Sequence, residues 1–106
     1  MKDLQKMALL LDFYGALLTP RQQELMRAYY LEDFSLAEIA GEDGVSRQAV
    51  HDLIKRSEAA LEEYEQKLGL VREYRRRQAL LEQLEEAIRR QDQAEALALV
   101  ARLKAE

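Results

Sequence analysis

The stretch SLAEIAGEDGVSRQAVHDLIKR, residues 35–56, decides the fold of this chain. It holds two helical patterns, and each begins at a serine of the kind that caps a helix N-terminus, Ser35 and Ser46. A short segment separates the two patterns, and Gly44 within it permits a tight turn. A short helix, a glycine-containing turn and a longer helix are the layout of a helix-turn-helix, in which the first helix supports the second.

The second helix of this motif is expected to separate apolar from polar side chains. Its first residues would face the major groove, where Arg suits guanine and Gln suits adenine. A serine at the helix start and basic side chains farther along suit phosphate groups. The expected inward residues are Ala49, Val50, Leu53 and Ile54, with Ala40 at the helix crossing and Val45 as a plug of the core. The candidate base contacts are Arg47, Gln48 and His51, and the candidate phosphate contacts are Ser46, Lys55 and Arg56.

Capping signals predict the helices that precede and continue the motif. A helix is expected over residues 3–18, and the next begins at Pro20 because Thr19 and Gln22 form a capping box. The short helix after Ser35 should be interrupted by residues 41–44, and the long helix should end at Gly69. The expected apolar face of the first helix consists of Leu4, Met7, Leu11, Tyr14 and Leu18, widened by Leu10, Phe13 and Leu17.

Two more amphipathic helices are expected after residue 69, and Asp92 would cap the second of them. They could fold back on the preceding helices or pair with a second chain, and a homodimer would align two recognition helices. We therefore expect a helix-turn-helix domain over residues 1–68, with the motif at 35–57, and dimerising helices over 69–106. Their expected apolar sides are Val71, Tyr74, Leu81, Leu84 and Ile88 in the first helix and Leu97, Val100 and Leu103 in the second.

Composition predicts an all-α helical bundle and argues against several classes of function. The 106 residues are 48% hydrophobic and include only 4 Gly and 1 Pro, too few for a turn-rich β protein. Without Cys, and with His51 as the one histidine, the chain offers neither a metal or cofactor site nor a catalytic pair, so no enzyme is expected. It also lacks an apolar run of the roughly 20 residues that a membrane span needs, and a signal peptide, so a cytoplasmic protein is expected.

The charge pattern limits how strongly the motif alone can hold a polyanion. The formal net charge is −4, and residues 35–68 carry 4 basic against 8 acidic side chains. Because phosphate attraction supplies much of the affinity for DNA, binding by a single copy should be weak. The densest basic cluster lies elsewhere, as a second phosphate-contacting patch or as a solvated face balanced by acidic neighbours. It consists of Arg72, Arg75, Arg76 and Arg77.

The motif and its surroundings resemble a known family. Residues 18–70 look like the fourth-region helix-turn-helix of bacterial sigma factors. More closely, residue 10 to about residue 74 resembles the YlxM or p13-like family of small bacterial helix-turn-helix proteins. The stretches that carry this resemblance are LLLDFYGALLT at 9–19, YYLEDFSLAEIA at 29–40, VSRQAVHDLIKR at 45–56 and LEEYEQKLGL at 61–70.

The resemblance implies a role beside the signal recognition particle, because genes of this family typically lie next to those of that particle. It implies a regulatory or accessory protein without demonstrated catalysis. Two kinds of partner remain open. The exposed side of residues 46–56 suits DNA or the RNA of the particle, while the acidic balance of residues 35–68 suits an adaptor that docks on the GTPase of the particle.

Overall fold

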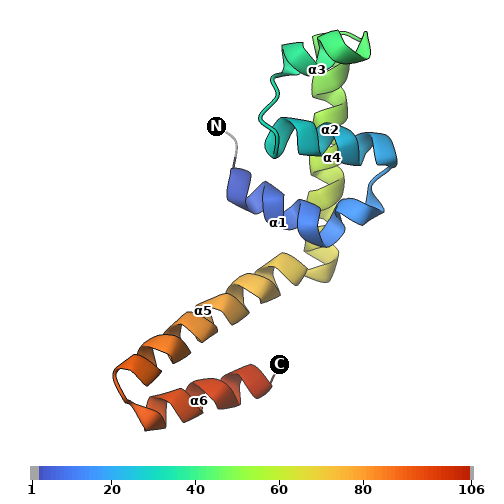
Figure 1. Cartoon of the computed structure of the whole chain (residues 1–106). Coiled ribbons are helices and arrows are strands. Elements are labelled where there is room, and N and C mark those ends of the chain that lie inside the picture. Colours follow the sequence, from blue (N-terminus) through green and yellow to red (C-terminus); the bar gives the residue numbers. More distant parts are fainter. Residues whose placement is uncertain (1–2, 106) are drawn as a thin grey trace. The chain divides into compact units, whose positions relative to one another are not determined.

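The computed structural model describes residues 3–105, which form six α-helices and one 3-10 turn without any strand (Figure 1). The predicted all-α class is therefore confirmed. The chain divides into two compact units, Met1–Gly69 and Leu70–Glu106. None of the described helices is both long and apolar enough to cross a membrane. The elements are α1 (Leu4–Tyr14), the 3-10 turn η1 (Gly15–Leu17), α2 (Pro20–Tyr30), α3 (Leu36–Asp43), α4 (Arg47–Leu68), α5 (Leu70–Arg89) and α6 (Gln93–Lys104).

The predicted capping signals set the helix boundaries. Thr19 with Gln22, and Ser35 with Glu38, form reciprocal capping boxes at the starts of α2 and α3. The Ser46 hydroxyl accepts from the Ala49 amide at 3.0 Å and so opens α4. These contacts confirm the predicted starts, since each satisfies an amide that would otherwise lack a partner in the first turn.

Two predicted helix ends were wrong. The first helix stops at Tyr14 and continues as the 3-10 turn η1, rather than running to Leu18. The third helix runs through Gly41 to Asp43 and ends at Gly44, whose φ of 68° lies in the left-handed region. Gly69, with φ 64°, ends α4 as predicted. A glycine in this conformation terminates a helix because it has no side chain to oppose it.

The core of unit 1 forms where α1, α2 and α3 pack along α4 (Figure 1). Tyr14 is completely buried, and its hydroxyl donates to the Glu65 carboxylate of α4 at 2.6 Å. Ser57 is also completely buried and donates to the Leu53 carbonyl at 2.8 Å. The large side chains buried most fully in this unit are Leu10, Tyr14, Leu25, Met26, Val50 and Leu61.

Several residues predicted to be inward are exposed. Leu4 and Phe13 of α1 and Leu17 of η1 lie at the edges of the predicted apolar face and are exposed. Val45 is 45% exposed, because it follows the left-handed Gly44 and lies outside both helices of the motif. Ala49 is exposed as well, because the buried row of α4 runs through Val50, Ile54, Ser57 and Leu61.

Unit 2 is a hairpin of α5 and α6 whose register differs from the predicted one. Its core consists of Leu80, Ala87 and Leu99, with Leu84, Ala96 and Leu103 packed against it. The predicted inward residues Leu81, Ile88, Leu97 and Val100 are instead exposed. The physical reason is that Ala87 and Ala96 are small, which lets the two helices approach along that side. Asp92 caps α6 as predicted, by accepting from the Glu95 amide at 3.0 Å.

Candidate nucleic-acid interface

The helix-turn-helix consists of α3, the turn at Gly44 and α4. Ile39 and Ala40 of α3 are each 5% exposed, and α3 packs against both α2 and α4. Val50 and Ile54 are the buried residues in the first turns of α4, at 2% exposure each. Ala40 is buried, which agrees with its predicted place at the helix crossing. This packing fixes α4 by the row of Val50 and Ile54, and the rest of the circumference of its first turns, the open side, is not part of that row.

The candidate contact residues are distributed over that open side of α4, where His51 and Lys55 also border a hollow lined by residues of α1 and α2. Arg47, His51 and Lys55 follow one another at intervals of four residues, so they form one row along the helix. Gln48, Asp52 and Arg56 form the neighbouring row by the same spacing. Every member of the two rows is exposed except His51, which is half-buried. Ser46 lies just before the first turn as its cap.

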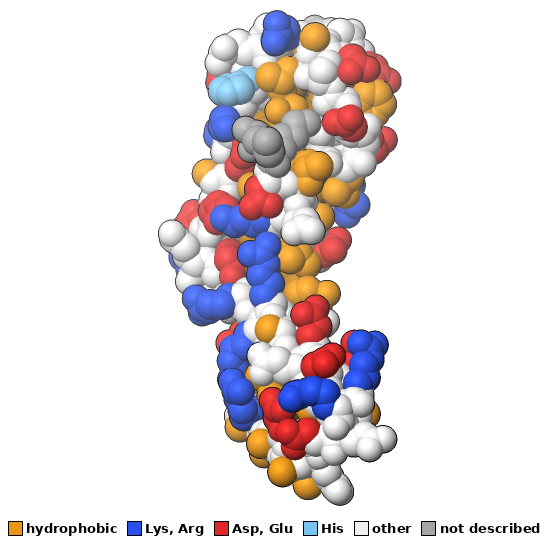
Figure 2. All heavy atoms as spheres, turned by 90° about the vertical axis from the view of Figure 1, so that its left-hand side faces the viewer, with side chains coloured by type: hydrophobic (Ala, Val, Ile, Leu, Met, Phe, Trp, Pro, Cys, Tyr) orange, Lys and Arg blue, Asp and Glu red, His pale blue; other side chains and the backbone are white. Residues whose placement is uncertain are grey.

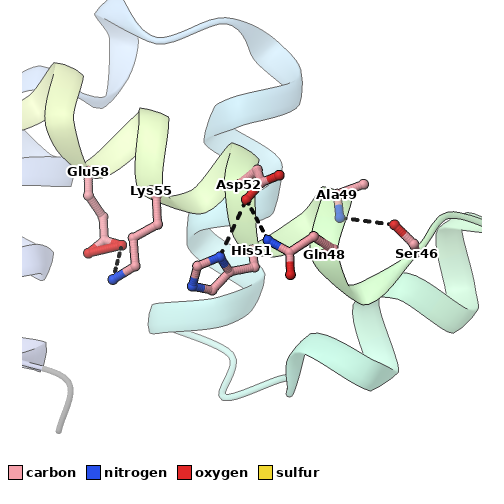
Figure 3. A network of polar contacts seen from close by, with 7 residues as sticks. All are labelled: Ser46, Gln48, Ala49, His51, Asp52, Lys55 and Glu58. Carbon is pink, nitrogen blue, oxygen red and sulfur yellow. Dashed lines mark hydrogen bonds and ion pairs between the residues drawn. The ribbon is translucent and has the colours of Figure 1, made fainter.

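Asp52 joins the two rows, a role that the sequence interpretation missed. Its carboxylate accepts from Nε2 of Gln48 at 2.8 Å and lies 3.6 Å from Nδ1 of His51 (Figure 3). The amide of Gln48 is thereby held in one orientation, with its oxygen left as an acceptor. The four-residue interval between Gln48 and Asp52 is a known stabilising spacing on helices and was the signal that could have revealed this contact.

A second acidic residue, Glu58, restrains the basic end of the same side. Lys55 Nζ lies 3.6 Å from its Oε1, and the Tyr30 hydroxyl donates to its Oε2 at 3.0 Å (Figure 3 shows Lys55 and Glu58). Burial, followed by the Glu58 carboxylate, raises the pKa of the Tyr30 phenol above its ordinary value. Tyr30 therefore stays protonated and remains a hydrogen-bond donor to Glu58.

Arg47 and Arg56 differ from these restrained residues. Neither forms an ion pair within residues 3–105, and both are exposed. Arg47 also borders a shallow hollow together with Leu36, Gln48 and His51. Two guanidinium groups at the edges of the open side are thus available to an external carboxylate, phosphate or base.

The wider surface carries both signs of charge. Figure 2 shows basic and acidic side chains intermixed over the viewed face rather than a single basic field. At the end of α3, Asp43 forms an ion pair of 2.5 Å with Arg21 of α2. Within residues 3–105 no cluster of three or more His, Asp or Glu side chains has the arrangement of a metal site.

The second basic cluster lies on α5 and does not form one patch. All four arginines are exposed. At about 100° of rotation per residue, Arg72, Arg75 and Arg76 share one side of the helix, while Arg77 points about 100° away from Arg76. At most three of the four can therefore face the same phosphate chain from this helix.

A family of helix-turn-helix proteins matches the sequence of this chain. The family model described as "Putative helix-turn-helix protein, YlxM / p13 like" matches residues 1–100. That description names a structural motif and no enzymatic activity. The match runs through α5 and most of α6, beyond the limit near residue 74 that the sequence interpretation gave to the resemblance.

Relatives from several bacteria match over most of their length. A UPF0122 protein of Symbiobacterium thermophilum is 67% identical over 106 residues, 100% of this chain and 99% of the relative. A UPF0122 protein of Geobacillus kaustophilus is 55% identical over 91 residues, 86% of this chain and 83% of the relative. A UPF0122 protein of Halalkalibacterium halodurans is 54% identical over 92 residues, 87% of this chain and 84% of the relative. The chain therefore belongs to the YlxM / p13-like family of helix-turn-helix proteins.

Proposed function

We propose that this protein is a nucleic-acid-binding regulatory or accessory protein of the bacterial signal recognition particle pathway. The observation that carries the nucleic-acid part is the open side of α4, which exposes Arg47 and Arg56 without ion-pair partners in residues 3–105. The pathway part rests on the resemblance to the YlxM family. A cytoplasmic location belongs to the same proposal.

The residues of the open side divide into two roles. Arg47 can donate two parallel hydrogen bonds to guanine, and Gln48 presents its amide oxygen while Asp52 holds its nitrogen. Asp52 and His51 then border the bases that these two side chains read. Lys55 and Arg56, both about two turns beyond Gln48, and the capped helix start at Ser46 contact phosphates and fix the register.

The affinity of one such module is expected to be modest. Only three basic side chains on the open side attract phosphate, and Lys55 is shared with Glu58. A homodimer doubles the number of phosphate contacts. On α5, Arg72, Arg75 and Arg76 supply a second phosphate-contacting group, and Arg77, the fourth arginine predicted for this patch, lies on another side of the helix. Pairing of two weak modules is therefore part of the proposal.

The test replaces Arg47 and compares the result with a charge-matched change on the same helix. Binding of the full chain is measured to a DNA site selected from a random pool and to the RNA of the signal recognition particle. Arg47→Ala is expected to weaken binding to the preferred target by about 5- to 150-fold and to relax its base preference, the loss of one bidentate contact. Lys67→Ala lies about 30 Å farther along α4 and should leave the base preference unchanged.

The outcome that contradicts this role is specific. If Arg47→Ala binds the preferred DNA and RNA as tightly and as selectively as the unchanged chain, Arg47 is not part of a reading surface. If neither nucleic acid is bound above the level of an unrelated sequence at low salt, the nucleic-acid part of the proposal fails.

A second candidate function is favoured by the charge of residues 35–68, which contain 4 basic and 8 acidic side chains. In that case the protein is an adaptor that docks on the GTPase of the signal recognition particle without touching nucleic acid. Co-purification with the GTPase should then survive nuclease treatment. Loss of the complex after nuclease treatment would instead indicate bridging by RNA.

A further inference from the structure

We propose that one face of the α5–α6 hairpin docks against the same face of a second copy of this chain. This apolar hairpin face consists of Leu81 and Ile88 of α5 with Leu97 and Val100 of α6. The inference deepens the homodimer of the proposed function by assigning its surface and its orientation, and it does not depend on nucleic-acid binding.

The four residues lie on one side of the hairpin. Leu81 and Ile88 are seven residues apart and therefore share a side of α5. Ile88 and Ala96 border one hollow beside the turn between the helices, and Val100 follows Ala96 by one helical turn. The apolar face thus continues from α5 across the turn region onto α6.

These side chains are too exposed for a surface that meets only water. Leu97 is 62% exposed, Ile88 61%, Leu81 41% and Val100 37%. The other side of the hairpin is polar, since Arg90 and Glu95 form an ion pair of 2.7 Å there. A face of four large apolar side chains opposite a charged face is the pattern of a helix pair that covers one side with a partner.

The small size of unit 2 points to association as the source of its stability. Residues 70–106 make up 37 residues, and the core within the hairpin has three fully buried members, Leu80, Ala87 and Leu99. Folded units below about 40 residues usually need disulfides, metals or oligomerisation. The chain has no cysteine, and its described residues contain no cluster suited to a metal, so contact with a further folded surface is the route that fits, and a second copy can supply it.

The sequence of α6 supports the same conclusion. Residues 96–101 read ALALVA, so this helix is apolar on nearly its whole circumference in its middle turns. The large apolar side chains of such a helix are normally buried. Only Leu99 of this run is fully buried within the chain, which leaves the side of Leu97 and Val100 for another surface.

Charge complementarity selects a second copy in opposite orientation. The open end of the hairpin, residues 70–80 and 99–105, carries six basic side chains and one acidic side chain, a net charge of +5. The turn end, residues 81–98, carries two basic and five acidic side chains, a net charge of −3. A two-fold axis across the apolar hairpin face lays the basic end of each copy over the acidic end of the other. The product is a four-helix arrangement with one shared core.

The test measures the mass of the full chain in solution by light scattering and sedimentation equilibrium. The unchanged protein is expected at twice the chain mass of 12.3 kDa in the micromolar range. Leu97→Glu places a charge in the proposed interface, and it is expected to shift the protein to the monomer mass. Ala98→Glu, the adjacent exposed position on the charged flank, is the matched control and should remain dimeric.

A second measurement covers the case in which Leu97→Glu perturbs the fold of unit 2. Because the chain has no cysteine, Val100→Cys and Ala98→Cys each introduce a single thiol. Mild oxidation should link Val100→Cys into covalent dimers much faster than Ala98→Cys. A monomer mass for the unchanged protein, a dimer that survives Leu97→Glu, or equal cross-linking of both cysteine variants would each overturn the inference. Failure of nucleic-acid binding would leave these masses unchanged and so is distinguishable.

Discussion

The turn of the helix-turn-helix can be tested by a pair of glycine substitutions with opposite expected effects. Gly44 has a φ of 68°, and a Cβ added there would meet no atom within 4 Å. Its replacement by alanine therefore introduces no clash, and its cost is the left-handed backbone itself. Gly41 lies inside α3 with helical backbone, and a Cβ there also meets nothing within 4 Å. The two positions thus differ in backbone conformation and not in available space.

The magnitudes follow from that difference. A non-glycine residue in the left-handed region costs about 1–2 kcal/mol, so Gly44→Ala should lower the free energy of unfolding by about 1–2 kcal/mol. Alanine in a helix is favoured over glycine by up to about 1 kcal/mol, so Gly41→Ala should raise the free energy of unfolding by up to that amount. For a unit of this size, each kcal/mol shifts the melting temperature by about 4–8 °C.

The assay is urea unfolding of the full chain, followed by circular dichroism and by tyrosine fluorescence. Gly44→Ala is expected to unfold at lower urea than the unchanged protein, and Gly41→Ala at higher urea. Shifts of the same sign in the two variants, or a Gly44→Ala protein as stable as the unchanged one, would refute a left-handed helix end at Gly44. The turn that presents α4 would then have another conformation.

Three further predictions address the turn of unit 2 and the polar contacts of α4. Gln91 has a φ of 60°, so Gln91→Gly is expected to raise the urea midpoint of the chain by relieving about 1 kcal/mol of backbone strain. The raised pKa of Tyr30 keeps it neutral when the unfolded chain ionises, so stability present below about pH 10 is lost as pH rises further. Tyr30→Phe should therefore lose less stability than the unchanged protein in urea titrations above that pH, and parallel losses would refute the role of its contact with Glu58. Asp52→Asn removes a negative charge and loosens the contact with Gln48. It should therefore raise the affinity for random DNA and reduce the preference for a selected site. Unchanged affinity and preference would exclude Asp52 from the interface.

The features that could be predicted from sequence are those decided by neighbours within four residues. The capping boxes at Thr19 and Ser35 depend on a side chain and an amide three positions apart, and both formed as expected. The same local logic identified Gly69 as the end of α4. Local contacts also include Gln48 with Asp52, and their four-residue spacing is enough to predict this hydrogen bond.

The register of the hairpin could not be predicted because two apolar rows fit the helical period equally well. In α5, one possible row consists of Leu81, Leu84 and Ile88. The other consists of Leu80, Leu84 and Ala87, so the two rows overlap at Leu84. The choice between them depends on the surface of α6, where Ala96 allows close approach, and that surface is distant in sequence from Leu80. The row left exposed by this choice, Leu81 and Ile88, belongs to the apolar hairpin face that we propose as the dimer surface.

One helix combines the two demands on this protein. α4 extends over 22 residues, and its buried row, Val50 to Leu61, is held by three other helices of unit 1. The orientation of its first turns is thereby fixed, which favours selective contacts through Arg47 and Gln48. Those turns carry little net positive charge, so selectivity is not accompanied by strong attraction to phosphate. We therefore infer that the proposed function requires two modules acting together, and that they pair through the apolar hairpin face, of which Leu97 and Ile88 are the most exposed members.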